Sequence, residues 1–455
     1  MKPITLKSVA QAVNGKISDE KYNDVVIENI TTDTRKISEG DLFIPLKGEN
    51  FDGHKFIEQA FEKGALCCLS AENTESEKSV IYVSDTRKAL RDLAEYYISL
   101  FDIPVVGITG SVGKTTTKDM IASVLMQKYN VLKTEGNFNN EIGLPLTVFK
   151  ITEDTQVAVL EMGMNSFGEI HNLSKIAKPD IAVITNVGVS HIENLGSREG
   201  ILKAKCEIFD FMKDNGTAVL NIDNDMLQTL EGKTKFNTLW YGVENKKDIY
   251  ADNIVKNGVE SISCDIHMKN ESFSVYIPVP GEHMVLNAMA AALVGNKLGL
   301  TVAEIKRGIE EFVPTKMRMA VIKTEKGTTI INDVYNANPV SMKAGIDVLS
   351  GGEGEKICIL GDMFELGQFA KEMHYDTGVY AAEKKIDKII CIGEISKSMY
   401  EGALSLGGNA FYFETQDEFI EKGIEELVSE GATVLVKASR GMHFEKTAEK
   451  IQEVK

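Results

Sequence analysis

The segment 105–120, with the sequence VVGITGSVGKTTTKDM, contains the residue types of a loop that binds phosphate groups. In the usual pattern, G-x-x-x-x-G-K-[ST], backbone N–H groups and a lysine hold the phosphates, and the hydroxyl group binds Mg²⁺. Gly113, Lys114 and Thr115 match the end of this pattern, but residue 108 is isoleucine instead of the first glycine. The segment follows an apolar strand pattern and begins a helical one, which is the context that such a loop requires. We therefore interpret it as an ATP-binding loop with an altered spacing, rather than as a turn with a solvent-facing lysine.

Two polar residues follow other strand patterns. Glu161 comes directly after the apolar run VAVL, and His191 follows the next apolar run, AVITNVGV. Because the carboxyl ends of adjacent parallel strands share one edge of a sheet, we expect both side chains near the loop that begins at Gly110. Taken alone, a glutamate at such a place is more often a helix cap, and a histidine an ordinary loop residue. Their shared edge with the loop favours a role as metal ligands.

Lys205 lies in the helical pattern of residues 198–212 and is the most informative single residue. Its neighbours three and four positions away are all apolar: Ile201, Leu202, Ile208 and Phe209. A lysine in an apolar stripe is costly while charged, so burial would lower its pKa and make the neutral amine accessible. A neutral amine can react with CO₂ to give a carbamate, an anion that suits a second Mg²⁺. The alternative is a lysine whose ammonium group reaches solvent over its own stem.

The elements that must position these residues form three segments. Residues 1–101 mix short strand and helix patterns. Residues 102–314 alternate Val/Ile/Leu-rich strands with helices such as 114–128 and 168–177, which is typical of a parallel sheet covered on both faces. Residues 315–455 repeat this alternation. We therefore predict an α/β protein of three domains: a small N-terminal domain, a central phosphate-loop domain with a parallel sheet, and a C-terminal Rossmann-like domain.

The composition excludes several classes of protein. A formal net charge of −17 argues against a general nucleic-acid binder, because phosphate backbones need a basic surface. No apolar run approaches the roughly 18 residues that span a bilayer, and the N-terminus lacks the apolar core of a secretory signal. We therefore expect a cytoplasmic protein without a transmembrane segment. The six cysteines show no C-x-x-C spacing and most lie in apolar runs, so we expect them to be reduced and buried.

The motifs together resemble the ATP-dependent Mur ligase family, whose members build the peptide of the cell-wall precursor. The family's loop has the form T-G-x-x-G-K-[ST]-[ST], which Thr109, Gly110 and residues 113–116 match. The absent glycine at 108 is thus the family's own spacing. Three further segments resemble the branch that adds D-alanyl-D-alanine: TDTRKISEGDLFIPLKGENFDGHKF (32–56), NDVYNANPVSM (332–342) and LGDMFELG (360–367) followed by His374. The resemblance covers nearly the whole chain.

The resemblance implies roles for the residues that match the family's nucleotide and metal positions. These residues are Thr109, Gly110, Gly113, Lys114, Thr115, Thr116, Glu161, His191, Lys205, Asn287, Arg318 and Asp333. ATP and two Mg²⁺ ions would be bound, with Thr115, Glu161, His191 and a carbamylated Lys205 as metal ligands. Asn287 would contact adenine. The catalytic residues would be Lys114, Glu161, His191, Lys205, Arg318 and Asp333, the last two supplied by the C-terminal domain.

A second set of residues matches the family's substrate-binding positions. It consists of Thr34, Arg35, Asn139, Asn140, Tyr335, Asn336 and Asn338. Met284 departs from the G-x-H-N form of other members, so no role is assigned to it. Lys437, Ser439 and Arg440 match a C-terminal motif, for which a structural turn at a strand end is as good an interpretation as ligand contact.

The implied reaction joins UDP-N-acetylmuramoyl-tripeptide (UDP-MurNAc-tripeptide) and D-Ala-D-Ala, both small molecules, with hydrolysis of ATP to ADP and phosphate. The N-terminal domain would bind the uridine nucleotide and the C-terminal domain the incoming amine, and we expect a monomer. The third residue of the tripeptide, lysine or diaminopimelate, stays open. A folylpolyglutamate synthase is one rival, against which DTRKISEGDLF and YNANP argue. A regulatory phosphate-loop ATPase is another, but it leaves Lys205 and the C-terminal motifs unexplained.

Overall fold

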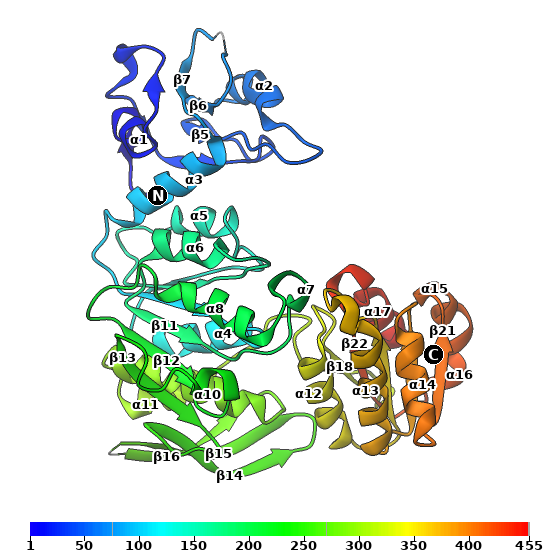
Figure 1. Ribbon diagram of the computed structural model, residues 1–455. Coiled ribbons are helices and arrows are strands. Elements are labelled where there is room, and N and C mark those ends of the chain that lie inside the picture. The colour runs from blue at the N-terminus through cyan, green and yellow to red at the C-terminus, as the bar shows by residue number, and fades with distance from the viewer. Residues whose placement is uncertain (75, 270, 454–455) are drawn as a thin grey trace. The chain divides into compact units, whose positions relative to one another are not determined.

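The computed structural model confirms the α/β class (Figure 1) and describes residues 1–74, 76–269 and 271–453. The chain divides into two compact units, and each is described by itself. The first unit comprises residues 1–109, 129–182 and 206–216, and the second comprises residues 110–128, 183–205 and 217–455. The predicted boundaries after residues 101 and 314 stay predictions.

The first unit begins with a small sheet in the strand order β2-β7-β6-β5-β4. Its strands are β2 (Lys16–Ile17), β4 (Asn29–Thr31), β5 (Asp41–Phe43), β6 (Cys67–Ser70) and β7 (Ser79–Tyr82), and a separate pair joins β1 (Ile4–Thr5) to β3 (Val26–Ile27). The helices are α1 (Leu6–Ala12), α2 (Ile57–Glu62) and α3 (Thr86–Ile98). Asp85 begins α3 because its carboxylate accepts the backbone N–H groups of Arg87 and Lys88 at 2.7 and 3.0 Å.

The rest of the first unit contains three parallel strands in the order β9-β10-β8. They are β8 (Val105–Thr109), β9 (Val131–Lys133) and β10 (Val157–Glu161), accompanied by α5 (Gly143–Val148) and α6 (Glu169–Ala177). Every residue of β8 and β10 is buried, as expected for strands covered on both faces. Thr109 and Glu161 are the last residues of their strands, so the sequence pattern placed both correctly at the carboxyl edge.

The second unit holds the helix that follows the phosphate loop, α4 (Lys114–Leu125), which packs against α10 (His283–Lys297) and α11 (Val302–Glu310). Its strands β12 (Thr217–Asn221), β13 (Asn237–Gly242) and β14 (Ile249–Asn257) pair in parallel, and β15 (Ser261–Met268) and β16 (Glu271–Ile277) continue antiparallel. The short helices are α7 (Ile192–Leu195), α8 (Arg198–Cys206) and α9 (Asp225–Gln228). Strand β11 (Ile181–Ile184) passes from the first unit to the second.

The C-terminal part of the second unit is a six-stranded sheet in the order β17-β18-β22-β19-β20-β21. Its strands are β17 (Ala320–Lys323), β18 (Thr329–Asn332), β19 (Lys356–Gly361), β20 (Lys388–Ile392), β21 (Ala410–Phe413) and β22 (Thr433–Lys437). All neighbours are parallel except β17 and β18. The helices are α12 (Pro339–Ser350), α13 (Ala370–Glu383), α14 (Ser396–Ser405), α15 (Gln416–Glu418), α16 (Ile424–Leu427) and α17 (Glu445–Glu453).

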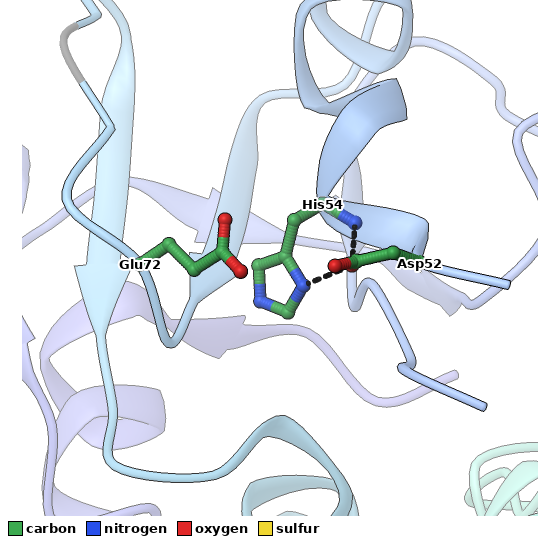
Figure 2. Close-up of side chains that lie close together, drawn as sticks. All are labelled: Asp52, His54 and Glu72. Carbon is green, nitrogen blue, oxygen red and sulfur yellow. Dashed lines mark hydrogen bonds and ion pairs between the residues drawn. The ribbon is translucent and has the colours of Figure 1, made fainter. Parts of the chain in front are cut away.

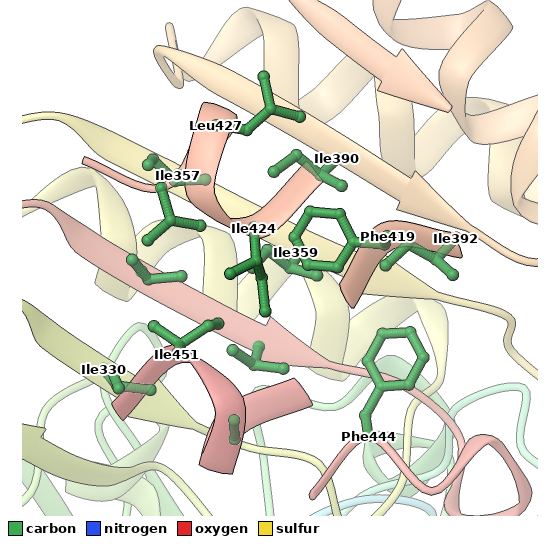
Figure 3. Packing of buried hydrophobic residues seen from close by; sticks show 14 of the residues in the cluster. Ile330, Ile357, Ile359, Ile390, Ile392, Phe419, Ile424, Leu427, Phe444 and Ile451 are labelled. Carbon is green, nitrogen blue, oxygen red and sulfur yellow. The ribbon is translucent and has the colours of Figure 1, made fainter. Parts of the chain in front are cut away.

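Apolar side chains from several of these strands and helices form one buried cluster (Figure 3). Ile330, Ile359 and Phe444 are each fully buried in it. Burial of each large side chain contributes about 1.5–3 kcal/mol to the stability of the fold. The cluster therefore stabilises the sheet that carries the loops at the strand ends.

Three further features bear on the sequence predictions. The helix predicted over residues 198–212 is shorter, because α8 ends at Cys206 and a 3₁₀ turn, Glu207–Phe209, follows it. All six cysteines are free; five of them are buried, as predicted, and Cys206 is half-buried. Among the described helices, none combines the length and the apolar character that crossing a membrane requires.

Candidate active site

Two glycines, Gly110 and Gly113, give the loop before α4 its backbone conformation. Gly113 precedes the helix with φ of +82°, in the left-handed region. A Cβ atom on Gly110 would lie 1.9 Å from the hydroxyl oxygen of Thr185, so the backbone approaches this side chain too closely for alanine. The first N–H groups of a helix have no acceptor within the helix, and they point at whatever the loop encloses. The loop therefore fits a polyphosphate group.

Residues after β11 hold this loop in place. The side-chain oxygen of Asn186 accepts the backbone N–H groups of Ser111 and Val112 at 3.1 and 2.9 Å. The hydroxyl of Thr185 donates to the carbonyl of Val112 at 2.7 Å. Sequence reasoning missed Asn186, and its only signal was its place directly after an apolar strand. These hydrogen bonds with Thr185 and Asn186 fix the loop in the absence of a ligand.

Two lysines, Lys114 and Lys205, belong to the site. The Lys114 ammonium donates to the carbonyl of Gly110 at 2.7 Å. Lys205 is 1% exposed, and burial together with the positive charge of Lys114 holds its pKa well below the ordinary value. No carboxylate of the described residues forms an ion pair with Lys205. Lys203, two residues earlier, is exposed.

His191 precedes α7 and meets a residue that sequence reasoning did not single out. Its Nδ1 atom lies 2.7 Å from Oε2 of Glu365, a distance typical of an ion pair, although the angle is not that of a hydrogen bond. The imidazole, and after it Lys114, lower the pKa of the Glu365 carboxyl. Glu365 belongs to the motif LGDMFELG. The motif could be recognised in the sequence, but its contact with His191 could not.

Asn287 lies beside the helix that follows the loop. Its side-chain oxygen accepts the hydroxyl of Thr117 at 3.0 Å, and its nitrogen donates weakly to the sulfur of Met284 at 3.5 Å. The side chain is almost fully buried. Met284 thus supports the amide from one side.

Lys437 is buried at the ends of β18 and β22, where it contacts Asp333 and Asn336. The Lys437 ammonium makes a very short contact with Oδ2 of Asp333 and donates to the carbonyl of Asn336 at 3.0 Å. The other oxygen of Asp333 accepts the backbone N–H of Met319 at 3.2 Å. Lys437 is 1% exposed. In this structure, Lys437 is therefore an internal partner of Asp333.

Arg318 stacks on Tyr335, with the guanidinium carbon 3.9 Å from the ring centroid. Its Nε atom is buried and, among the described residues, has no hydrogen-bond partner. Met317 and Met319 on either side both have positive φ, 64° and 51°. Left-handed backbone is costly for residues other than glycine, and its occurrence on both sides of one arginine marks a functional segment.

Asn338 caps helix α12. Its side-chain oxygen accepts the backbone N–H of Ser341 at 2.9 Å, and Pro339 occupies the first helical turn. The side-chain nitrogen donates to the hydroxyl of Ser190 at 3.0 Å. Asn336 is exposed. Both predicted substrate-binding residues have side-chain hydrogen bonds within the protein: the Asn336 side-chain oxygen accepts the backbone N–H of Ala337 at 2.9 Å, but Asn336 is exposed whereas Asn338 is half-buried.

In the first unit, Glu161 is only 1% exposed. One carboxylate oxygen accepts the Asn139 side chain at 2.8 Å, and the other, Oε2, has no hydrogen-bond partner among the described residues. A buried carboxylate oxygen without a partner is costly, and a cation would satisfy it. Mg²⁺ prefers such oxygen ligands. Glu161 therefore fits the predicted metal role, with Asn139 as its support.

Three other predicted residues of the first unit lie in local turns. Asn140 accepts the backbone N–H groups of residues 142 and 143 at 3.1 and 2.8 Å and so begins α5. Arg35 is largely exposed and pairs with Asp33 at 2.9 Å. The carbonyl of Thr34 accepts the ammonium of Lys63 at 2.9 Å. The Arg35 guanidinium is thus presented on the surface.

Asp52, His54 and Glu72 lie close together in the first unit (Figure 2). Both ring nitrogens of His54 are engaged: Nδ1 with Asp52 at 2.9 Å, and Nε2 with the backbone N–H of Ala71 at 3.2 Å. Because Nε2 accepts from a backbone N–H, the ring proton lies on Nδ1 and faces the carboxylate. The pKa of Asp52 falls to about 2, chiefly through its bond to the His54 backbone N–H. The histidine is a structural clamp.

His374, which follows the motif LGDMFELG, also has a structural role. It is fully buried, its Nε2 accepts the backbone N–H of Met363 at 2.9 Å, and its Nδ1 meets the carbonyl of Ala370 at 2.6 Å. Burial lowers its pKa. The hydroxyl of Ser439 accepts the backbone N–H of Phe364 at 2.9 Å. These bonds fix the loop that carries Glu365.

Comparisons with known families agree along most of the chain. Residues 26–98 match the Mur ligase family catalytic domain, residues 108–295 the Mur ligase middle domain, and residues 317–440 the glutamate ligase domain of Mur ligases. One match falls within each of the three segments predicted from the sequence.

Individual relatives are similar over nearly their full length. A UDP-N-acetylmuramoyl-tripeptide–D-alanyl-D-alanine ligase of Bacillus subtilis (strain 168) is 43% identical over 97% of this chain and 96% of its own. A crystal structure of MurF from Acinetobacter baumannii is 33% identical, covers 100% and 99% of the two chains, and superposes with a TM-score of 0.94. A structure of MurF ligase from Thermotoga maritima in complex with ADP is 30% identical, covers 94% and 97%, and gives a TM-score of 0.85.

Proposed function

Because this chain belongs to the Mur ligase family, we propose that it is an ATP-dependent ligase that joins D-alanyl-D-alanine to UDP-N-acetylmuramoyl-tripeptide. The products would be the UDP-MurNAc-pentapeptide, ADP and phosphate. Relatives that carry this ligase name match the chain end to end, and the three motif segments point to the same branch. The observation that supports the chemistry best is Lys205, which is buried, feels the charge of Lys114 and pairs with no carboxylate among the residues that the structure describes.

The proposed reaction needs an activated carboxylate, because carboxylates do not acylate amines at neutral pH. The γ-phosphoryl group of ATP moves to the tripeptide carboxylate, forming an acyl phosphate and ADP. The dipeptide amine then attacks the acyl carbon, the amide bond forms, and phosphate leaves. Both partners of the first step are anions, so positive charge must gather around them. Lys114 would supply it from the phosphate loop, and Arg318 from the segment before β17.

The residues Thr115, Glu161, His191 and Lys205 would hold two Mg²⁺ ions. When bound, the ions would neutralise the phosphate oxygens and draw the tripeptide carboxylate toward them. Lys205 would contribute after its neutral amine adds to CO₂, which releases one proton and leaves a carbamate anion. Its lowered pKa favours this step, since only the uncharged amine is a nucleophile.

We assign the substrates to the three segments. Residues 1–101 would bind the uridine nucleotide through Thr34 and Arg35, and Asn139 and Asn140 would face the muramyl peptide. Asn287 would contact adenine. The C-terminal segment would bind D-Ala-D-Ala through Tyr335, Asn336 and Asn338, and would bring Arg318 and Asp333 to the nucleotide. We further propose a cytoplasmic monomer, in keeping with substrates that are soluble small molecules.

A substrate-dependence assay tests the function. Phosphate release from ATP should require UDP-MurNAc-tripeptide and D-Ala-D-Ala together, and mass spectrometry should find the pentapeptide. Parallel reactions with lysine- and diaminopimelate-containing tripeptides would identify the third residue. Phosphate release that requires a folate and glutamate would support the rival ligase. ATP hydrolysis without any amide product would support the regulatory ATPase, and either result would overturn the proposal.

A further inference from the structure

Three residues of the C-terminal part of the second unit approach the short segment that contains His191. Oε2 of Glu365 lies 2.7 Å from Nδ1 of His191. A Cβ atom on Gly367 would lie 3.3 Å from the side chain of Glu193. Asn338 donates to Ser190 at 3.0 Å. The C-terminal part of the second unit thus contacts the segment around His191 at several points.

Both residues of the His191–Glu365 contact have an unfavourable backbone conformation. His191 has φ of +63° and Glu365 has φ of +64°, in the left-handed region that disfavours residues with a Cβ atom. Glycine would occupy either position more easily, yet each carries a side chain that reaches the other. Such outliers persist where the surrounding structure requires them, and they concentrate at functional sites.

We propose that Glu365 is a positioning residue for His191: its carboxylate holds the ring proton on Nδ1, so that Nε2 is left as the nitrogen that binds a divalent cation. The inference rests on the proposed function, in which His191 is a magnesium ligand. Histidines that bind metals usually donate their second ring N–H to a carboxylate or carbonyl, which fixes the tautomer and the ring orientation. The two atoms are already within hydrogen-bond distance, 2.7 Å, so only the orientation of the ring must change for the carboxylate to accept the Nδ1 proton.

The position of Glu365 depends on the C-terminal part of the chain. His374 and Ser439 fix the two residues before it through the backbone N–H groups of Met363 and Phe364. The charge of Lys114 also acts on the Glu365 carboxylate. Contact between the loop that carries Glu365 and His191 would therefore complete the metal site. The same contact would bring the C-terminal segment that binds D-Ala-D-Ala into place. A site that is complete only after docking would limit the hydrolysis of ATP in the absence of the third substrate.

Nitrogen-15 NMR of histidine-labelled protein tests the tautomer directly, without any turnover. His191→Asn identifies the His191 signals among those of the seven histidines. We expect the Nδ1–H form of His191 in the wild type, and the Nε2–H form, which free histidine prefers, in Glu365→Ala. Glu365→Gln keeps an acceptor and should retain the Nδ1–H form in part. Glu372→Gln, an exposed glutamate at the start of α13, is the matched control and should leave the signals unchanged. An Nε2–H tautomer in the wild type would overturn the inference.

Metal affinity gives a second readout. With Mn²⁺ as an EPR-visible probe and a non-hydrolysable ATP analogue, Glu365→Ala should bind the metal about 10- to 100-fold more weakly, the usual loss for such a supporting residue. Glu365→Gln should lose less, and Glu372→Gln nothing. If Glu365→Ala binds Mn²⁺ like the wild type, the inference is wrong while the proposed function stands. If the wild type itself fails to form pentapeptide, the proposed function fails instead.

Stability separates this role from a purely structural one. Glu365→Gly removes the side chain and relieves the left-handed backbone but also frees the unfolded chain, so its midpoint of urea unfolding should stay close to that of the wild type while its Mn²⁺ affinity falls. A side chain kept for stability would give a lower midpoint, and that result would count against the inference.

Discussion

Lys205 and Lys437 are equally buried, each 1% exposed, but their surroundings are opposite. The Lys437 ammonium contacts the carboxylate of Asp333 and donates to the carbonyl of Asn336 at 3.0 Å. Lys205 pairs with no carboxylate of the described chain. The charge that acts on its pKa is that of another lysine, Lys114. Burial alone therefore does not mark a functional lysine. A buried lysine that pairs with no carboxylate of the described residues is the better candidate for a functional role, because an amine that nothing neutralises is available for chemistry.

The largest effect should come from Lys205→Met, which keeps the volume of the side chain and removes the amine. We expect ligation to slow by about 1,000-fold or more, the upper range for loss of one electrostatic group in an active site. High bicarbonate should not restore it. The free energy of unfolding should not decrease, because no partnered charge is lost. Wild-type turnover of this variant in a phosphate-release assay would contradict the carbamate proposal.

Lys437→Met should show the reverse pattern, with its main effect on folding. Removing one partner of a buried ion pair leaves the Asp333 carboxylate uncompensated, which costs about 3 kcal/mol. Urea unfolding measures the loss. The double variant Asp333→Asn, Lys437→Met removes both charges and should recover part of it. If Lys437→Met unfolds like the wild type, the two lysines are not opposites and the comparison fails.

Tyr335 tests a second cation without a full set of partners among the described residues, the half-buried Arg318. Replacing the ring by leucine removes a stacking contact worth about 1 kcal/mol, so kcat should fall roughly 5-fold as the guanidinium loses its support. Tyr335→Phe keeps the ring and should behave like the wild type. Calorimetry should find uridine-nucleotide binding unchanged in both variants. A loss of that binding would place the residue in the wrong segment.

Local pattern was enough to predict several of these features. The apolar neighbours of Lys205 foretold its burial, and the strand runs before Thr109 and Glu161 placed both residues at strand ends. The shorter α8 shows the limit of periodicity, because the apolar stripe continues beyond Cys206 while the backbone tightens into a 3₁₀ turn.

Partners distant in sequence could not be predicted in the same way. Asn186, which holds the phosphate loop, and Glu365, which meets His191, contact residues 74 and 174 positions away. No period or spacing in one sequence encodes such contacts. Asn338 shows a related gap: its motif suggested a ligand contact, but the same side chain caps α12 and donates to Ser190. A motif identifies which residues matter and leaves open which atoms they touch.

The smallest expected effect, on pH dependence, extends the comparison to a histidine whose partners require it to be neutral. Burial lowers the pKa of His374 from an ordinary value of 6.5, so below that value the unfolded chain binds a proton that the folded chain does not. Stability from this residue is therefore complete above pH 6.5 and is lost as the pH falls through the lowered pKa, by up to about 1 kcal/mol per pH unit.

The physical cause of this loss is the Met363 bond. Protonation would turn Nε2 from an acceptor into a donor that faces the backbone N–H of Met363, and the loop that carries Glu365 would be released. His374→Gln should therefore unfold in urea with a flatter dependence between pH 7.5 and 5.5 than the wild type. His443→Gln, at an exposed histidine, should keep the wild-type slope. Equal slopes in all three proteins would mean that the partners of His374 tolerate its charge, and that the contrast between partnered and unpartnered buried groups does not extend to this loop.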